Sequence, residues 1–464
     1  MKRLLLIWMV LLIWTGTAMA EELVFLEESA VANRFAANPR AVRDIGDPFV
    51  VTTSDGYQVF ATGGPIGFFT WRSEDLTVFE RSKALKKVSW ASSDYWAPEV
   101  FRAGDRWVML YTARWKETGS LRTGIAFSDS LEGPYEDPLG RPLIDYGYAT
   151  IDATLTWDDD GTPYLIFVRD CSENFVDGRG ESHIYGVRLR EDLLGTVGDP
   201  VLLLRPEGEW ETRSGDTRWN EGPAAIRHDG KTYLFYSVNG YWMKEYSVCV
   251  AAADHPLGPY SRQGNNPLLA PVEDETGVIV SGPGHNAFFR VGEEWFTAYH
   301  THTYPLAPSG NRQLCVDRAG FHTDGTAFIN GPTLAPQLRP LAETHLCNAA
   351  PLAETAGDET GLLTDGDACA SPASAPWLWE GTEVTFRWSE GITADLLVLC
   401  PAPGESLAGQ VTINGTRTAP FSLQPGGLPG QQLILPFAPL EITELKLSFP
   451  EKTRLGEVYV IGAD

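Results

Sequence analysis

Residues 219–237 read WNEGPAAIRHDGKTYLFYS, and this stretch decides the fold of the chain. It predicts a short apolar strand, a turn at Asp229-Gly230, and a second strand with alternating aromatic residues. An Asp-Gly pair between two such runs is a strong hairpin signal, because a tight primed turn needs positive φ angles. One residue breaks the apolar pattern, since the carboxylate of Glu221 stands at the head of the first strand.

The same strand-turn-strand unit occurs five times, at intervals of roughly 50 to 70 residues, a spacing typical of propeller blades. The other copies begin at Asp47, Pro98, Asp152 and His285. A single blade cannot bury both of its faces, whereas blades packed in a ring can, and the ring leaves a central channel. We therefore expect an all-β protein whose main part, at about residues 43–340, is a five-bladed β-propeller.

Polar side chains stand near the start of each first strand, and in a propeller these strands line the channel. They are Asp47, Glu99, Asp152, Glu221 and His285. Carboxylates gathered at one mouth of a channel repel one another, which destabilises the fold. Their presence despite this cost indicates that they have a function. The alternative is that these residues only cap strand ends beside water.

The net charge and the aromatic content of the chain indicate which kinds of partner it binds. The chain has 464 residues, more than one typical domain, and a formal net charge of −25, which argues against nucleic acid or an anionic membrane as partner. Its 15 Trp and 16 Tyr suit both a β-rich core and stacking against sugars. We expect a monomer that binds a substrate without strong negative charge.

The N-terminus reads as a secretory signal peptide. Met1-Lys2-Arg3 is a basic start, Leu4 to Trp14 is apolar, and Ala18-Met19-Ala20 fits a small-x-small cleavage site. The apolar run is shorter than the ~20 residues that span a bilayer, which disfavours the alternative of a membrane anchor. Cleavage after Ala20 predicts a secreted or periplasmic protein with no membrane attachment.

Six cysteines follow the signal peptide, an even number that permits disulfides in an exported protein. Cys249 and Cys315 lie within apolar strand patterns, where a buried free thiol is the commoner state. We expect at most one or two bridges, within the C-terminal part, and the sequence does not fix their pairing.

Five short motifs resemble the successive blade motifs of the family 43 glycoside hydrolases. They are Asp47-Pro48, Trp96-Ala97-Pro98-Glu99, Ile151-Asp152-Ala153, Glu221-Gly222-Pro223 and Gly282-Pro283-Gly284-His285-Asn286. The resemblance covers about residues 43–340, with the motifs in the right order and in register with the repeat. It implies an inverting hydrolase, of the α-L-arabinofuranosidase or β-xylosidase type, that cleaves arabinose- or xylose-containing plant polysaccharides or oligosaccharides.

The resemblance also implies residue roles. Asp47 looks like the general base, Glu221 like the general acid, and Asp152 like the third carboxylate, which tunes the pKa of the acid and holds its orientation. His285 matches an axial histidine that in similar enzymes often holds water or Ca²⁺, and no cofactor is otherwise expected. One histidine with nearby carboxylates is not an oxygen-rich calcium loop, so both occupants remain open for this site.

The chemistry agrees with these roles. An inverting glycosidase needs a protonated carboxyl for the leaving oxygen and an ionised one, about 6.5–9.5 Å away, to activate water. Blades one and four face each other across a five-bladed ring, which leaves room for such a gap. Asp152, on the blade next to that of Glu221, can raise the pKa of Glu221 by like-charge repulsion. Glu99 is a competing candidate for the acid, and Asp44 a competing base with a loop position.

Other side chains are candidates for substrate binding. Similar enzymes have an arginine in the last blade that holds sugar hydroxyls and the acid, and Arg312 fits best, with Arg318 as the alternative. Trp96 and Trp219 each lie within a few residues of a channel-facing carboxylate, so both are candidate stacking walls. Packing between blades is the alternative for either tryptophan.

After Pro340 the composition changes. The sequence predicts four parts: the signal peptide at 1–20, the catalytic propeller at 21–341, a linker at 342–360 and an accessory β-sandwich at 361–464. Short alternating runs separated by turns favour the sandwich. Leu363-Thr364-Asp365-Gly366-Asp367 and Gly456–Val460 resemble galactose-binding-like (discoidin-type) domains, which implies carbohydrate binding with Trp377 or Trp379 as a platform. The alternative is a domain that only shields a propeller edge.

Two other functions were weighed against the inverting hydrolase. A retaining fructan-type hydrolase on a similar propeller normally shows an Arg-Asp-Pro motif in the middle blade, where this chain has Ile151-Asp152-Ala153. A non-catalytic sugar-binding propeller would have no need of Asp47, Asp152 and Glu221 together. The lack of an Arg-Asp-Pro motif in the middle blade and the presence of all three acids both favour the inverting enzyme.

Overall fold

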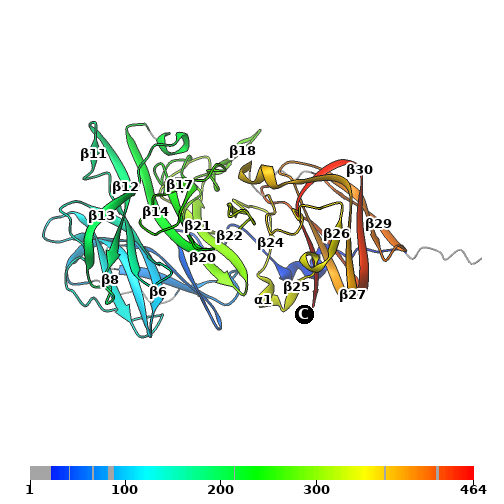
Figure 1. Cartoon of the computed structure of the whole chain (residues 1–464), viewed down its shortest axis with the longest axis horizontal. Helices are drawn as coiled ribbons and strands as arrows, with labels where there is room; N and C mark the ends of the chain where they lie inside the picture. Colours follow the sequence, from blue (N-terminus) through cyan, green and yellow to red (C-terminus); the bar gives the residue numbers. More distant parts are fainter. Residues whose placement is uncertain are drawn as a thin grey trace, which may run out of the picture.

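The computed structural model describes residues 22–40, 42–64, 67–81, 88–213, 215–369, 372–424 and 428–463. The signal peptide predicted at residues 1–20 lies outside these ranges. The chain forms a propeller and a smaller sandwich beside it (Figure 1). Within the described residues, no helix is long and apolar enough to cross a membrane.

The propeller has the five blades that the repeat predicts. Blade one contains β2 (Phe49–Thr53), β3 (Gly56–Gly64), β4 (Gly67–Ser73) and β5 (Glu80–Arg81). Blade two contains β6 (Ala91–Ala103), β7 (Arg106–Trp115) and β8 (Leu121–Ser128). Blade three contains β9 (Thr150–Trp157), β10 (Pro163–Arg169), β12 (Arg179–Leu189) and β13 (Thr196–Leu204). Blade four contains β14 (Thr217–His228), β15 (Lys231–Val238), β16 (Ser247–Ala253) and β17 (Ser261–Arg262). Blade five contains β20 (Gly284–Val291), β21 (Glu294–His302), β22 (Arg312–Phe321) and β23 (Ala327–Ile329).

Neighbouring strands in each blade are antiparallel, as hairpins require. In blade four the predicted turn joins His228 to its partner Lys231 in register. Blades three and four are also linked directly, because β12 pairs in parallel with β14 at residues 180–182 and 217–219. Four short elements accompany the blades: β11 (Phe175–Val176), η2 (Glu209–Thr212), β18 (Val272–Asp274) and β19 (Gly277–Val280).

Apolar layers between the blades hold the ring together. The layer that closes it joins blade one to blade five, where Val50 and Val59 pack in one cluster with Phe289 and Phe296. Burying a side chain of this size stabilises the fold by about 1.5–3 kcal/mol. The first strands are thereby fixed around the channel, which positions the polar residues at their heads.

The sandwich has β25 (Leu346–Asn348), β26 (Glu354–Ala356), β27 (Trp379–Pro401), β28 (Leu407–Ile413), β29 (Arg417–Leu423) and β30 (Leu433–Ala463) in one sheet system. The helical turns α1 (Leu341–Thr344), η3 (Ala350–Leu352) and η4 (Pro372–Trp377) accompany them. The prediction of a linker at 342–360 is wrong, because β25 pairs with β30 and β26 pairs with β27. Backbone hydrogen bonds make this segment part of the sandwich.

The N-terminal segment also belongs with the sandwich as much as with the propeller. Glu22 and Phe25 form bridges with Thr418 and Phe437. After η1 (Glu28–Arg34), β1 (Phe35–Ala36) pairs with β24 (Gln337–Leu338). Arg34 at the end of η1 donates two hydrogen bonds of 2.7 Å to Asp395 of the sandwich. The chain therefore ties the two lobes together from both ends of the propeller.

Two further expectations can be checked here. All six cysteines are free, and Cys249 and Cys315 are buried as expected. Trp379 is wrong as a sugar platform, because it is buried in the sandwich core and its indole donates to the Gly357 carbonyl at 2.7 Å.

Candidate active site

One backbone position recurs on all five blades at the same mouth of the channel. It has a positive φ of 43–54° and is occupied by Asp47, Ala97, Asp152, Gly222 and His285. The ladder on the second to fifth blades shifts register beside it, as in a β-bulge. A left-handed conformation costs a residue other than glycine about 1–2 kcal/mol, and bulges commonly aim side chains at active sites. These left-handed backbone conformations therefore mark the ring of residues that faces the channel.

The backbone N–H of each of these residues donates a hydrogen bond to a side chain of the preceding blade. Four acceptors stand on the second strand of that blade, and the fifth is Asp152 on a first strand. The donor–acceptor pairs, 2.7–3.3 Å long, are Asp47 and His300, Ala97 and Thr62, Asp152 and Thr112, Gly222 and Asp152, and His285 and Ser237. This cycle of bonds joins every blade to its neighbour at the mouth.

Asp47 is held as an ionised carboxylate. Arg312 donates to its Oδ1 at 2.7 Å, Thr62 donates to its Oδ2, and His285 Nδ1 lies 3.3 Å from Oδ1. Burial would raise the pKa of Asp47, but Arg312 and His285 together hold that pKa well below its usual range. The side chain keeps 12% of its surface exposed, enough for contact with a water molecule or substrate.

Asp152 interacts electrostatically with both of the other acids. Its Oδ2 accepts the 3.1 Å bond from Gly222, the residue that follows Glu221, and its side chain also interacts with His285. Burial, opposed by His285 and reinforced by the negative charge of Asp47, raises the pKa of Asp152 to about 6. It is therefore charged near neutral pH and acts electrostatically on its neighbours.

Glu221 is held in its protonated form. Burial and then the charge of Asp152 raise the pKa of Glu221 well above its usual value. Tyr246 donates its hydroxyl to Glu221 Oε1 at 2.9 Å, and the ring of Tyr246 stacks on His300 at 5.6 Å. One ionised and one protonated carboxyl is the combination that inverting glycoside hydrolysis needs, and the charge of Asp152 helps to keep the acid protonated.

Comparison with known proteins decides the family. The model of the family described as "Glycosyl hydrolases family 43" matches residues 35–327, the segment that holds all five blades. The chain belongs to glycosyl hydrolase family 43. It is an O-glycosyl hydrolase, and inversion and independence of cofactors are characteristic of this family.

Individual family 43 relatives differ in their substrates. The chain is 33% identical over 282 residues to the β-D-galactofuranosidase xynD of Aspergillus niger, which covers 56% of this chain and 72% of the relative. It is 26% identical over 262 residues to a xylosidase/arabinosidase of Bacteroides ovatus, covering 52% of this chain and 75% of the relative. A solved structure of a thermostable family-43 glycoside hydrolase is 40% identical with a TM-score of 0.62, covering 66% of this chain and 99% of that one.

Arg312 contacts a different acid from the one expected. It pairs with Asp47 rather than with Glu221. Gly46 makes this approach possible, because a Cβ there would lie 1.9 Å from the Arg312 guanidinium carbon. The alternative, Arg318, pairs with Glu294 at 2.8 Å and with the carbonyls of Leu338 and Arg339, which is a structural role at the edge of the propeller.

Glu99 and Asp44 hold different positions from the three acids in their blades. Burial raises the pKa of Glu99 to about 8, although Thr154 opposes the shift, and Asp152 adds to it. Glu99 sits two residues after the left-handed position of its blade, whereas Glu221 sits one before, so the two glutamates enter the channel from different points of the motif. Asp44 is exposed in a loop, as its position in the sequence suggested.

The tryptophan candidates are both half-buried. Trp96 packs against an apolar cluster that includes residues of blades three and four. Trp219 meets Trp242 edge-on at 5.2 Å, and Trp242 meets Tyr241 at 5.1 Å. Tyr241 in turn lies beneath the Arg312 guanidinium at 5.0 Å. An aromatic wall therefore runs from Trp219 to the arginine that holds Asp47.

The metal role suggested for His285 stays a prediction. Its Nδ1 faces Asp47 Oδ1, and Gly222 has no Cβ because one would lie 3.0 Å from the same nitrogen. In the part of the chain that the structure describes, no three His, Cys, Asp or Glu side chains are grouped so as to hold a metal ion. We derive no step through calcium.

Several residues of the site escaped the sequence analysis. Thr62, Thr112, Ser237 and His300 bind the left-handed backbone positions, and Tyr246 binds the acid. Burial lowers the pKa of His300 well below its usual value, and its Nδ1 accepts from Asp47, so the ring is neutral with its proton on Nε2. The only sequence signal of Thr62, Thr112, Ser237 and His300 is a polar residue inside an otherwise apolar second strand, and Tyr246, just before β16, lacks even that signal.

Proposed function

We propose that this chain is a secreted enzyme that removes pentose units from arabinose- or xylose-containing polysaccharides or oligosaccharides, with Asp47 as general base, Glu221 as general acid and Asp152 as the group that sets the pKa of the acid. The observation that carries the proposal is the opposite protonation of Asp47 and Glu221 in one channel mouth. The predicted signal peptide and the xylosidase/arabinosidase relative support secretion and the substrate class respectively.

The steps follow from the protonation states. Glu221 gives its proton to the leaving oxygen as the glycosidic bond breaks, and the anomeric carbon develops positive charge. Asp47 removes a proton from a water that attacks the opposite face of the sugar, which inverts the configuration. Asp152, charged beside Glu221, keeps the acid protonated before the step, and Arg312 keeps the base ionised and oriented.

A second substrate has a specific observation in its favour. The relative with 33% identity is named as a β-D-galactofuranosidase. The rings of α-L-arabinofuranose and β-D-galactofuranose have the same stereochemistry and differ in the exocyclic group at C4. A channel mouth that accepts the first therefore accepts the second if there is space beyond that carbon.

Rates on three 4-nitrophenyl glycosides test the substrate class. They are the α-L-arabinofuranoside, the β-D-xylopyranoside and the β-D-galactofuranoside, and kcat/KM is measured for each. The proposal expects the arabinofuranoside or the xyloside to be the best substrate. A galactofuranoside preferred more than tenfold over both would replace it with the second candidate, and no turnover of any of the three would contradict the pentosidase proposal.

A further inference from the structure

A large cavity lies away from the channel mouth, where the propeller meets the sandwich. It measures about 1120 Å³. The propeller contributes Trp210 of η2, and residues 263–268 and 270–274, which lead from β17 into β18. The sandwich contributes Trp377 of η4, residues 400–405 and residues 428–432. Figure 1 shows β18 on the side of the propeller that faces the sandwich. Neither Asp47, Asp152 nor Glu221 lines this cavity.

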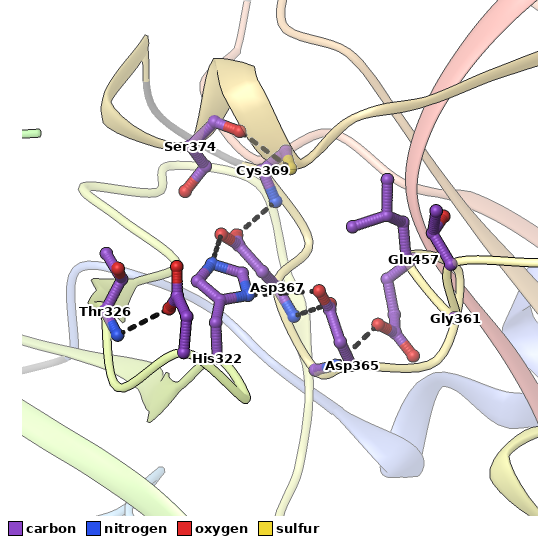
Figure 2. A network of polar contacts seen from close by, with 12 residues as sticks. His322, Thr326, Gly361, Asp365, Asp367, Cys369, Ser374 and Glu457 are labelled. Atoms are coloured by element: carbon purple, nitrogen blue, oxygen red, sulfur yellow. Dashed lines mark hydrogen bonds and ion pairs between the residues drawn. The ribbon is translucent and has the colours of Figure 1, made fainter.

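An aromatic surface is held rigidly at the sandwich wall of the cavity. The ring of Trp377 stacks on His322 of the propeller at 4.4 Å and 7° between planes. His322 is fixed between Asp365 at 3.1 Å and Asp367 at 3.2 Å (Figure 2). Because one face of the indole is covered by His322, the part that lines the cavity is its other face and its edge. Such a surface suits the C–H face of a sugar ring.

Amide groups accompany the two tryptophans. The carbonyl oxygen of Gln263 accepts from the Ala327 N–H at 3.2 Å, and no bond from its amino group is found in the part of the chain that the structure describes. Asn265 and Gln432 also line the cavity. Planar amides beside aromatic rings give the mixture of apolar walls and few directed polar groups that binds small neutral ligands.

The charges around the cavity disfavour an anionic ligand. Its lining includes the carboxylates of Glu273, Asp274 and Glu405, and no lysine or arginine occurs among its described residues. Lys244 and Arg454 pair with Glu273 and Glu405 from outside the lining. A ligand with its own carboxylates or phosphates would meet like charge here, whereas an uncharged one would not.

We propose that the cavity between propeller and sandwich is a second, non-catalytic carbohydrate site that holds a neutral oligosaccharide segment of the polymer. Its volume exceeds the roughly 300–1,000 Å³ of ordinary ligand pockets, so it admits several sugar units. The inference rests on the proposed function for the class of polymer. It places sugar binding at the junction of the two lobes, with Trp377 as the platform, rather than on the sandwich alone.

Gly264 supplies a matched pair of variants. It is exposed, it lines the cavity, and a Cβ built there meets no atom within 4 Å. Gly264→Trp should therefore add an indole to the cavity lining from a Cβ that meets no neighbour, and Gly264→Ala should leave the cavity open. Both are made in full-length protein that also carries Glu221→Gln, so that hydrolysis does not consume the ligand.

Calorimetric titration with xylohexaose and with arabinohexaose tests the proposal. We expect two binding events for at least one of them, and expect Gly264→Trp to weaken one event at least tenfold while Gly264→Ala preserves both. Hexagalacturonate, as the anionic control, should bind at the second site at least tenfold more weakly. A single event, or two events that Gly264→Trp leaves unchanged, would overturn the proposal, and so would equal binding of hexagalacturonate.

The binding experiment can fail while the proposed hydrolytic function holds, and the two results can be told apart. The reaction is scored on 4-nitrophenyl glycosides, which are too small to reach from the channel mouth to the junction, and Gly264→Trp in the otherwise unchanged enzyme should hydrolyse them at the wild-type rate. Loss of oligosaccharide binding with that rate intact supports the second site. Hydrolysis of pentosides without a second binding event would leave the active-site proposal standing and remove this one.

Discussion

The backbone N–H of Gly222 donates a hydrogen bond of 3.1 Å to Asp152 Oδ2. On the other four blades the equivalent N–H binds a side chain on a second strand, so blade four is the exception in the ring. The bond places the charge of Asp152 next to the residue that precedes Gly222, which is Glu221. A single hydrogen bond thus couples the position of one acid to the pKa of another.

Replacing Asp152 by Asn tests that coupling. The amide oxygen can still accept from Gly222, but the negative charge that helps raise the pKa of Glu221 is gone. The pKa of Glu221 should fall, so the alkaline limb of the kcat/KM profile should move to lower pH, by about one unit or more. Asp129→Asn, at an exposed position, is the control. An unmoved alkaline limb in Asp152→Asn would refute this role.

Tyr246→Phe removes the hydroxyl that orients Glu221. The acid then loses its 2.9 Å partner in a buried setting, which should cost about 1–3 kcal/mol of stability and reduce kcat by roughly tenfold or more. Because that bond lowers the pKa of Glu221, its loss should also move the alkaline limb to higher pH. A profile identical to that of the wild type would show that Tyr246 does not act on the acid.

Arg312→Met should impair the base. Without the guanidinium the pKa of Asp47 rises, so the acidic limb of kcat/KM should move to higher pH. The lost orientation of the carboxylate should reduce kcat/KM by about 100-fold. Arg318→Met is the matched control, since Arg318 stands on the same strand, β22, but binds Glu294. A shifted acidic limb in the control, or none in Arg312→Met, would contradict the assignment.

The contact between propeller and sandwich should weaken at alkaline pH. Burial lowers the pKa of His322, but Asp365 and Asp367 outweigh it and raise that pKa from 6.5 to about 9. A raised histidine pKa gives stability that is complete below pH 6.5 and is lost as pH rises through about 9. The melting temperature should therefore fall between pH 7 and 9.5, by roughly 2 °C or more, and His322→Gln should flatten this dependence. His228→Gln, beside exposed Asp229, should not.

The sequence predicted the ring and the three acids because both leave repeated signals. Turns and aromatic runs mark each blade, and Asp47, Asp152 and Glu221 stand at or near the heads of apolar first strands. It did not predict His300, since a polar residue in a second strand looks the same whether it packs or binds a neighbour, and it did not predict Tyr246, which lies in the loop just before β16. The segment 342–360 looked like a linker because β25 and β26 are too short to show a period of two.

The register of the motifs also could not be read without coordinates. Glu99 and Glu221 look equivalent along the sequence, yet the left-handed positions of their blades are Ala97 and Gly222. Backbone conformation, which a bulge changes by one residue, decides which side chain faces the channel. The pairing of Arg312 with Asp47 likewise depends on the closure of blade five onto blade one.

Dependence on the leaving group tests the division of roles between Glu221 and Asp47 most directly. Two glycosides of the same sugar are compared, one with a 2,4-dinitrophenyl group that needs no protonation and one with an alkyl group that does. Glu221→Gln should lose at least 100-fold in kcat/KM on the alkyl glycoside and less than tenfold on the dinitrophenyl glycoside, whereas Asp47→Asn should lose activity equally on both. Equal losses on the two substrates in Glu221→Gln would contradict the account.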